Sequence, residues 1–76
     1  MNLDEKTPEL GNRLRVLRAE RDLSQAALAG MAGVTRQTII SIENGGYYPS
    51  VRLALILARA LERRVDEVFF LEEAEN

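Results

Sequence analysis

The sequence contains no cysteine and no histidine, and only two of its 76 residues are proline. Without cysteine there can be no disulfide bond and no zinc finger, which fits a protein of the reducing cytoplasm. Without cysteine or histidine, and with most carboxylates near the two ends of the chain, we find no group of residues typical of a catalytic or metal site. The five glycines form no phosphate-binding loop. We therefore expect no enzyme activity, no metal and no cofactor.

Long hydrophobic runs are also missing. No stretch approaches the ~18 uncharged apolar residues of a membrane-spanning helix, and the first twenty residues lack the apolar segment of a signal peptide. A chain of this length can form one small domain. We expect a cytoplasmic protein without a membrane partner, with a flexible N-terminal tail at 1–8, a domain at 9–72 and an acidic C-terminal tail at 73–76.

The charges are unevenly distributed, although the formal net charge is only −2. Residues 12–65 contain nine arginines and four carboxylates, so this segment carries a net charge of +5. Residues 66–76 contain five carboxylates and no basic residue, so they carry −5. A basic central segment between acidic ends can present a positive face to a nucleic acid despite the overall acidity.

Apolar residues recur at helical spacing through most of the sequence. This pattern predicts helices over residues 12–21, 25–32, 36–44, 51–63 and 65–69. Three of them follow residues that favour helix N-caps, namely Ser24, Thr35 and Ser50. The predicted fold is therefore all-α and compact, with five helices. The two ends of the domain could in addition pair as a two-strand ribbon, formed by the segment near Leu10 and residues 70–72.

The segment 24–44 has the spacing of a helix-turn-helix. Two short helices joined by about three residues must cross steeply, and their closest contact needs small side chains. Ala29 and Gly33 supply these small residues at the fifth and ninth positions of the segment's helical part. Apolar residues fill the positions around them, namely Leu28, Ala32, Val34, Ile39 and Ile42. The alternative to a helix-turn-helix is an ordinary helical hairpin.

These residues give the chain a family resemblance. The pairs and runs that carry it are Ser24-Gln25, Leu28-Ala29, Gly33-Val34, residues 36–39, residues 42–45 and Pro49-Ser50. The stretch from about residue 10 to 70 resembles the Cro and phage-repressor (XRE) family of helix-turn-helix transcriptional regulators, and is most similar to their short, single-domain members. The resemblance implies a lambda-repressor-like DNA-binding domain whose third helix lies in the major groove of DNA.

Four residues on the outward side of the third predicted helix are the candidates for reading bases. Arg36 can bond to guanine O6 and N7, and Gln37 can bond to adenine N6 and N7. Ile40 suits a thymine methyl group, and Ser41 can bond to either base type. A solvated or phosphate-binding charge remains open for Arg36, and a contact with another protein remains open for Ile40.

The resemblance assigns further residues to the DNA backbone and to the fold. We expect phosphate contacts from Gln25, Thr35, Asn44, Tyr47 and Arg52. Simple capping remains open for Gln25, and a turn of the chain for Asn44. In the family, the positions of Arg18 and Glu43 often form an ion pair shielded from water, so we expect a structural pair here. The alternative is two separate surface charges.

Surplus apolar residues near the end of the chain predict a homodimer interface, formed by Ile56, Phe69, Phe70 and Leu71. The alternative is that the end folds back as a ribbon and hides these side chains within one chain. Taken together, the sequence predicts a DNA-binding regulator, specifically a repressor, that binds double-stranded DNA as a homodimer. The competing interpretation is an antitoxin or protein-interaction module that uses the same fold to bind a protein partner.

Overall fold

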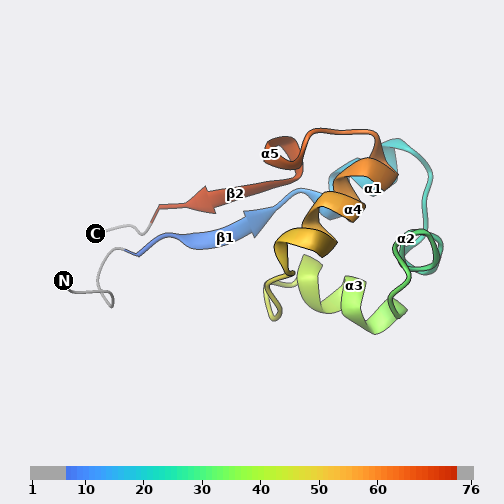
Figure 1. The fold of residues 1–76 in the computed structure, drawn as a ribbon, viewed down its shortest axis with the longest axis horizontal. Coiled ribbons are helices and arrows are strands. Elements are labelled where there is room, and N and C mark those ends of the chain that lie inside the picture. The colour runs from blue at the N-terminus through green and yellow to red at the C-terminus, as the bar shows by residue number, and fades with distance from the viewer. Residues whose placement is uncertain (1–6, 74–76) are drawn as a thin grey trace.

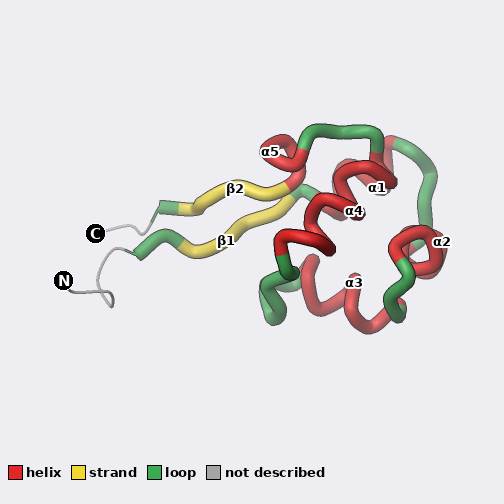
Figure 2. Tube along the Cα trace, viewed as in Figure 1, coloured by secondary structure: helices red, strands yellow, loops and turns green. Residues whose placement is uncertain are grey.

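The computed structural model describes residues 7–73. The elements follow the order β1 (Glu9–Asn12), α1 (Leu14–Glu20), α2 (Gln25–Ala32), α3 (Arg36–Glu43), α4 (Val51–Leu61), α5 (Val65–Val68) and β2 (Phe69–Glu72). The helices form one body, and the two strands form a ribbon that projects from its side (Figures 1 and 2). Most residues of the two expected tails, 1–6 and 74–76, lie outside the described residues.

All five helices contribute to or cover a single apolar core. Its fully buried large side chains are Leu14, Leu28, Ile39, Ile42, Leu57, Leu61 and Val68. Full burial of one such side chain stabilises the fold by about 1.5–3 kcal/mol, so this core is the main source of stability. None of the helices within residues 7–73 is long and apolar enough to cross a membrane.

The three predicted N-caps are present, and α2, α3 and α4 begin at the predicted residues. The side-chain oxygens of Ser24, Thr35 and Ser50 each accept a hydrogen bond from the backbone N–H three residues further on. Such a cap contributes about 1 kcal/mol. Gly33 ends α2 with φ of 72°, in the left-handed region that glycine adopts without strain, and this turn directs the chain into α3.

The first helix begins two residues later than predicted because Asn12 belongs to β1. Its side-chain oxygen accepts a hydrogen bond from the backbone N–H of Leu14 at 3.1 Å. Its side-chain nitrogen donates to the carbonyl oxygen of Ile42 at 2.9 Å. Asn12 thus joins the ribbon, the start of α1 and the end of α3, a contact between distant segments that helical periodicity does not reveal.

Four predicted helix ends were one or two residues too long. Helix α1 ends at Glu20, with Arg21 as its cap. Helix α3 ends at Glu43, with Asn44 as its cap. Helix α4 ends at Leu61 because Glu62 takes a left-handed conformation with φ of 56°. Helix α5 ends at Val68 because the next residue takes extended backbone angles and begins β2.

The two-strand ribbon that the sequence only suggested is present in the structure. Strands β1 and β2 pair antiparallel, with Leu10 opposite Leu71 and Gly11 opposite Phe70. A Cβ atom on Gly11 would lie 2.6 Å from the ring of Phe70 and 2.7 Å from the side chain of Glu72, so a larger residue would require these side chains to shift. The ribbon does not hide the apolar surplus, because Phe70 remains 38% exposed and Leu71 64% exposed.

Of the expected dimer interface, one residue is buried in the core and another is half-buried. Phe69, which directly follows α5, is only 9% exposed and packs in the core. Ile56 is half-buried, so it offers less apolar surface than the sequence indicated. The most exposed apolar residues of α4 are Val51 and Leu55, which lie one turn apart and are 77% and 51% exposed.

Candidate nucleic-acid interface

Helix α3 presents one side to the core and the other to solvent. Ile39 and Ile42 are fully buried, and this burial fixes the rotation of the helix about its axis. Arg36 and Gln37 are exposed at its first turn. Ile40 and Ser41 follow one turn later and are half-buried, so Ile40 is less exposed to solvent than the sequence indicated. The four candidate base-reading residues therefore all have solvent access at the surface of α3.

A surface groove of about 560 Å³ runs between α3, the loop that follows it and the start of α4. Gln37 and Ser41 line it from α3, and Gln37 Nε2 donates a 3.4 Å hydrogen bond to Ser41 Oγ. Thr35 and Tyr47 line the same groove. The structure thus brings two candidate base-reading residues next to two candidate phosphate-binding residues.

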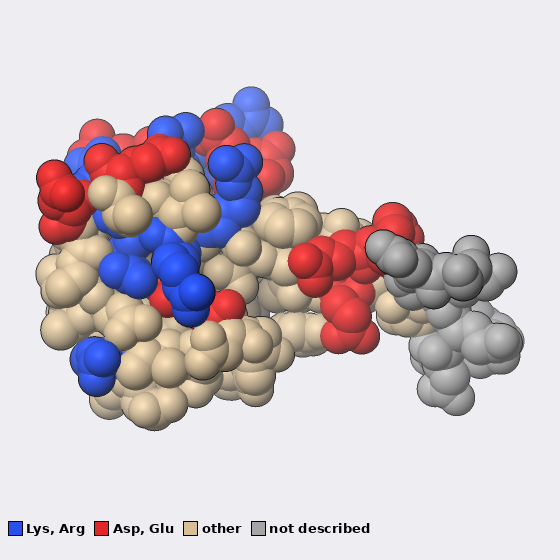
Figure 3. Space-filling view, turned by 180° about the vertical axis from the view of Figure 1, so that it is seen from behind, with Lys and Arg blue, Asp and Glu red and all other residues tan. Residues whose placement is uncertain are grey.

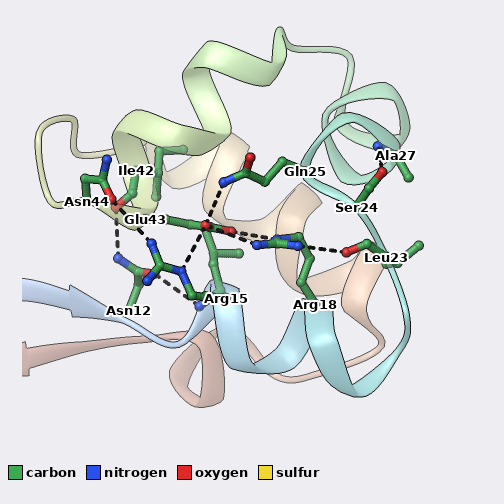
Figure 4. A network of polar contacts seen from close by, with 11 residues as sticks. Asn12, Arg15, Arg18, Leu23, Ser24, Gln25, Ala27, Ile42, Glu43 and Asn44 are labelled. Carbon is green, nitrogen blue, oxygen red and sulfur yellow. Dashed lines mark hydrogen bonds and ion pairs between the residues drawn. The ribbon is translucent and has the colours of Figure 1, made fainter.

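The other candidate phosphate-binding residues do not line this groove. Arg52 is exposed on the first turn of α4 and, like Arg36, forms no ion pair with another described residue. Gln25 begins α2, and its Nε2 donates to Glu43 Oε1 at 3.1 Å. Asn44 caps α3 and accepts a 3.5 Å hydrogen bond from Arg15 Nη2. Gln25 and Asn44 therefore belong to one polar network, which Figure 4 shows.

The centre of this network is the pair of Arg18 and Glu43. Arg18 Nε donates to Glu43 Oε2 at 2.7 Å, and Arg18 Nη2 donates to Glu43 Oε1 at 3.3 Å. Arg18 Nη1 also donates to the carbonyl oxygen of Leu23 at 2.9 Å. The side chain of Glu43 is 1% exposed and that of Arg18 is 14% exposed. The structure therefore brings these two residues together as a two-bond ion pair shielded from water.

The surroundings of Glu43 keep it ionised. Burial alone raises the pKa of Glu43, because an apolar environment disfavours the charged carboxylate. Hydrogen bonds from Arg18 and Gln25, together with the positive charges of Arg18 and Arg15, outweigh burial and hold the pKa below its ordinary value. The carboxylate thus links α1, α2 and α3 through charged hydrogen bonds.

The sequence did not single out Arg15 as a member of a site, and for Tyr48 it left open a contact with the DNA backbone or packing beneath the loop. Arg15 lies one turn before Arg18 on α1, and this i, i+3 spacing was the available signal. The hydroxyl group of Tyr48 donates to the carboxylate of Glu9 and accepts a 3.4 Å hydrogen bond from the backbone N–H of Leu10. Tyr48 therefore attaches the loop after α3 to the ribbon rather than packing beneath that loop.

The arginines divide into paired and unpaired groups. Exposed ion pairs at 2.6–3.1 Å occupy three of them, in the pairs Arg21–Glu62, Arg63–Glu20 and Arg64–Asp66. Carboxylates also gather along the ribbon, apart from the arginines on the body (Figure 3). Four arginines form no ion pair within residues 7–73, namely Arg13, Arg36, Arg52 and Arg59. Two of them, Arg36 on α3 and Arg52 on α4, lie at the candidate interface.

Comparisons with known proteins agree with this geometry. A family model of helix-turn-helix proteins (HTH_3) matches residues 14–68. The chain is 45% identical over 62 residues to the uncharacterised HTH-type transcriptional regulator YgzD of Bacillus subtilis, covering 82% of this chain and 94% of that protein.

Two solved structures are also similar. The restriction-modification controller protein C.AhdI from Aeromonas hydrophila is 37% identical with a TM-score of 0.68, over 71% of this chain and 78% of that one. The P22 c2 repressor, solved in complex with a synthetic operator, is 33% identical with a TM-score of 0.69, over 71% of this chain and 82% of that one. The chain therefore belongs to the helix-turn-helix family of DNA-binding transcriptional regulators, of the XRE type that includes the Cro and phage-repressor proteins.

Proposed function

We propose that this protein is a sequence-specific transcriptional repressor that inserts α3 into the major groove of double-stranded DNA. The observation that carries the proposal is the exposure of Arg36, Gln37, Ile40 and Ser41 on a helix whose opposite side is fully buried. An α-helix fits the width of the major groove, and its first-turn residues reach base edges there. The similar P22 c2 repressor was solved in complex with a synthetic operator, which supports DNA as the partner of this chain.

The chemistry of the outward side chains suits base reading. Gln37 contacts Ser41 only through a 3.4 Å hydrogen bond, so its amide can exchange this contact for the N6 and N7 atoms of an adenine. Arg36 has no competing carboxylate among the described residues and can bond to a guanine. Ile40 is half-buried, and the accessible part of its side chain can contact a thymine methyl group.

The flanking residues would hold the DNA backbone. Thr35 and Tyr47 border the groove beside α3, and the exposed guanidinium of Arg52 lies near it on α4. On the other side, Gln25 keeps a second Nε2 hydrogen after its bond to Glu43, and the first amides of α2 suit an anion. Contacts on both sides of α3 would fix the orientation of the helix in the groove.

We further propose that the protein acts as a homodimer. A domain of this size makes few phosphate contacts, and binding two half-sites is the usual way to gain affinity. Exposed apolar side chains lie on α4 and on the ribbon, namely Val51, Leu55, Phe70 and Leu71. Tyr48 connects these two regions, because it precedes α4 and contacts β1. This revised surface replaces the one centred on Ile56 and Phe69.

The need to bind one DNA duplex restricts how two copies can pack. Edge-to-edge pairing of two β2 strands has a two-fold axis perpendicular to the ribbon, and that rotation would carry α3 to the opposite side of the assembly (Figure 1). Two α3 helices could then not reach the same duplex. Packing through the faces of the ribbon and α4 avoids this problem, and it would let the helices enter successive major grooves ~34–36 Å apart.

Selection of bound fragments from a random pool of duplex DNA tests the proposal directly. We expect a two-fold symmetric motif whose half-sites are about one helical turn apart, and binding that weakens steeply as salt concentration rises. Failure to enrich any motif would contradict sequence-specific binding. A protein partner whose affinity does not depend on salt would favour the antitoxin or protein-interaction alternative, for which Met31 offers an exposed apolar side chain on α2.

A further inference from the structure

Arg15 is held much more loosely than its neighbour Arg18. The side chain of Arg15 is 68% exposed, and its Nε lies 3.6 Å from Glu43 Oε1. Its Nη2 reaches Asn44 Oδ1 at 3.5 Å, the outer limit of a hydrogen bond. Arg18, in contrast, binds the same carboxylate at 2.7 Å and is almost fully enclosed. The carboxylate of Glu43 is therefore satisfied without Arg15.

The network has an excess of positive charge at its surface. Two arginines, Arg15 and Arg18, adjoin one ionised carboxylate, so one positive charge remains. Because Glu43 is enclosed and Arg18 is committed to it, the uncompensated charge is carried by the exposed guanidinium of Arg15. An arginine has five N–H donors, and Arg15 uses few of them. An anion at the surface could take the rest.

The donors of Arg15 and Gln25 meet at one oxygen atom. Gln25 Nε2 donates to Glu43 Oε1, the same atom that Arg15 Nε faces (Figure 4). The two side chains come from α1 and α2 and flank this oxygen, while Asn44 at the end of α3 contacts Arg15 from a third element. Gln25 and Asn44 are also the residues proposed above to contact the DNA backbone beside α3.

We propose that Arg15 is a DNA-binding residue that, together with Gln25, holds one backbone phosphate at the α1–α2 side of α3. The proposal rests on the proposed function, because it requires α3 to lie in the major groove. A phosphate oxygen replaces the long contacts of Arg15 with short, charge-assisted hydrogen bonds. Glu43 has a second role in this arrangement. From its buried position it orients the side chains of Gln25 and Arg15 and does not itself contact the phosphate.

The competing explanation is that Arg15 only supports Glu43 within the fold. In that case its removal would lower stability but leave the number of phosphate contacts unchanged. The salt dependence of DNA binding distinguishes the two, because each phosphate neutralised by a cation adds about 0.9 to the slope of log affinity against log salt concentration. Loss of an arginine that binds phosphate must therefore make the slope shallower.

The experiment compares Arg15→Gln with wild type and with Arg21→Gln, which removes the same charge from an exposed ion pair with Glu62. Binding to one duplex carrying the selected motif and to one unrelated duplex is measured by fluorescence anisotropy at several salt concentrations. Selection from random DNA is repeated with Arg15→Gln, and thermal melts verify that each variant is folded. We expect Arg15→Gln to reduce the slope by about 0.9, to weaken specific and nonspecific duplexes alike, and to leave the selected motif unchanged. Arg21→Gln should keep the wild-type slope.

Several outcomes would overturn the assignment of Arg15. One is a wild-type slope in folded Arg15→Gln, and another is an equal reduction in both variants, which would indicate a general charge effect. A third is a change in the selected motif, which would indicate a base contact. Absence of DNA binding by the wild-type protein would instead contradict the proposed function itself, so the two failures are distinguishable.

Discussion

Removal of Arg18 should destabilise the protein far more than removal of any exposed arginine. In Arg18→Met the carboxylate of Glu43 loses both hydrogen bonds from Arg18, including its shortest one, and stays enclosed, with only Gln25 and the distant Arg15 near it. Breaking a buried ion pair by removing one partner costs about 3–5 kcal/mol. The total stability of a small domain is about 5–15 kcal/mol, so this variant should be partly unfolded under mild conditions.

A double-mutant cycle isolates the pair. Arg18→Met combined with Glu43→Leu leaves no stranded charge, so the double variant should lose less free energy of unfolding than the two single variants together, by about 0.5–3 kcal/mol. The matched control is the exposed pair of Arg21 and Glu62, whose nitrogen–oxygen distance of 2.6 Å is just as short. Their side chains are 40% and 70% exposed, and such a pair should contribute only about 0.2–1 kcal/mol.

The assay is urea unfolding followed by far-ultraviolet circular dichroism, with the same variants measured at one pH and one salt concentration. If Arg18→Met and Glu43→Leu each lose only a few tenths of a kcal/mol and their effects add, the reasoning is refuted. Enclosure and a short distance would then be poor guides to the energy of this pair. If the control pair gave an equally large coupling, burial could not be the cause of the difference.

Three further predictions concern bases, assembly and pH. Gln37→Ala should weaken binding to the preferred site by about 1–3 kcal/mol and relax preference at one base position, whereas Gln25→Ala should weaken all duplexes equally. A selected motif that is unchanged in Gln37→Ala would contradict the reading role. Leu71→Asp should convert a dimer to a monomer in analytical ultracentrifugation, whereas Val16→Asp on α1 should not, and a wild-type protein that sediments as a monomer at micromolar concentrations would contradict the dimer. Since the pKa of Glu43 is lowered in the folded state, its contribution should be complete above the ordinary carboxyl pKa and be lost as pH falls through the folded value. Glu43→Gln should abolish that acid-dependent part of the free energy of unfolding, which melts at several pH values would reveal.

Most of the helical fold could be predicted because its signals are local. A capping side chain acts on a backbone N–H three residues away, and Gly33 acts at its own position, so Ser24, Thr35 and Gly33 are visible in any short stretch of sequence. Helix ends were less predictable, because the left-handed conformation of Glu62 and the extended one of Phe69 depend on distant packing.

The errors at the candidate interfaces have a similar cause. Ile56 and Leu55 are adjacent apolar residues on one helix, and the choice between them depends on a helix rotation that Leu53 and Leu57 do not fix closely enough from the sequence alone. Tyr48 could not be assigned because its partners Glu9 and Leu10 lie nearly forty residues earlier, with |i−j| of 39 and 38. Side chains that join distant segments leave no periodic signal.

The last turn of α3 shows why these long-range contacts matter for the proposed function. Three consecutive residues each bind an earlier segment: the carbonyl of Ile42 accepts from Asn12 on β1, and Glu43 and Asn44 contact arginines on α1. Helix α3, the proposed base-reading helix, is therefore attached at its C-terminal end to the strand β1 of the ribbon. If two copies pack through that ribbon and α4, the attachment transmits the geometry of the dimer contact to the distance between the two α3 helices. Half-site spacing would then be set by side chains that never touch DNA.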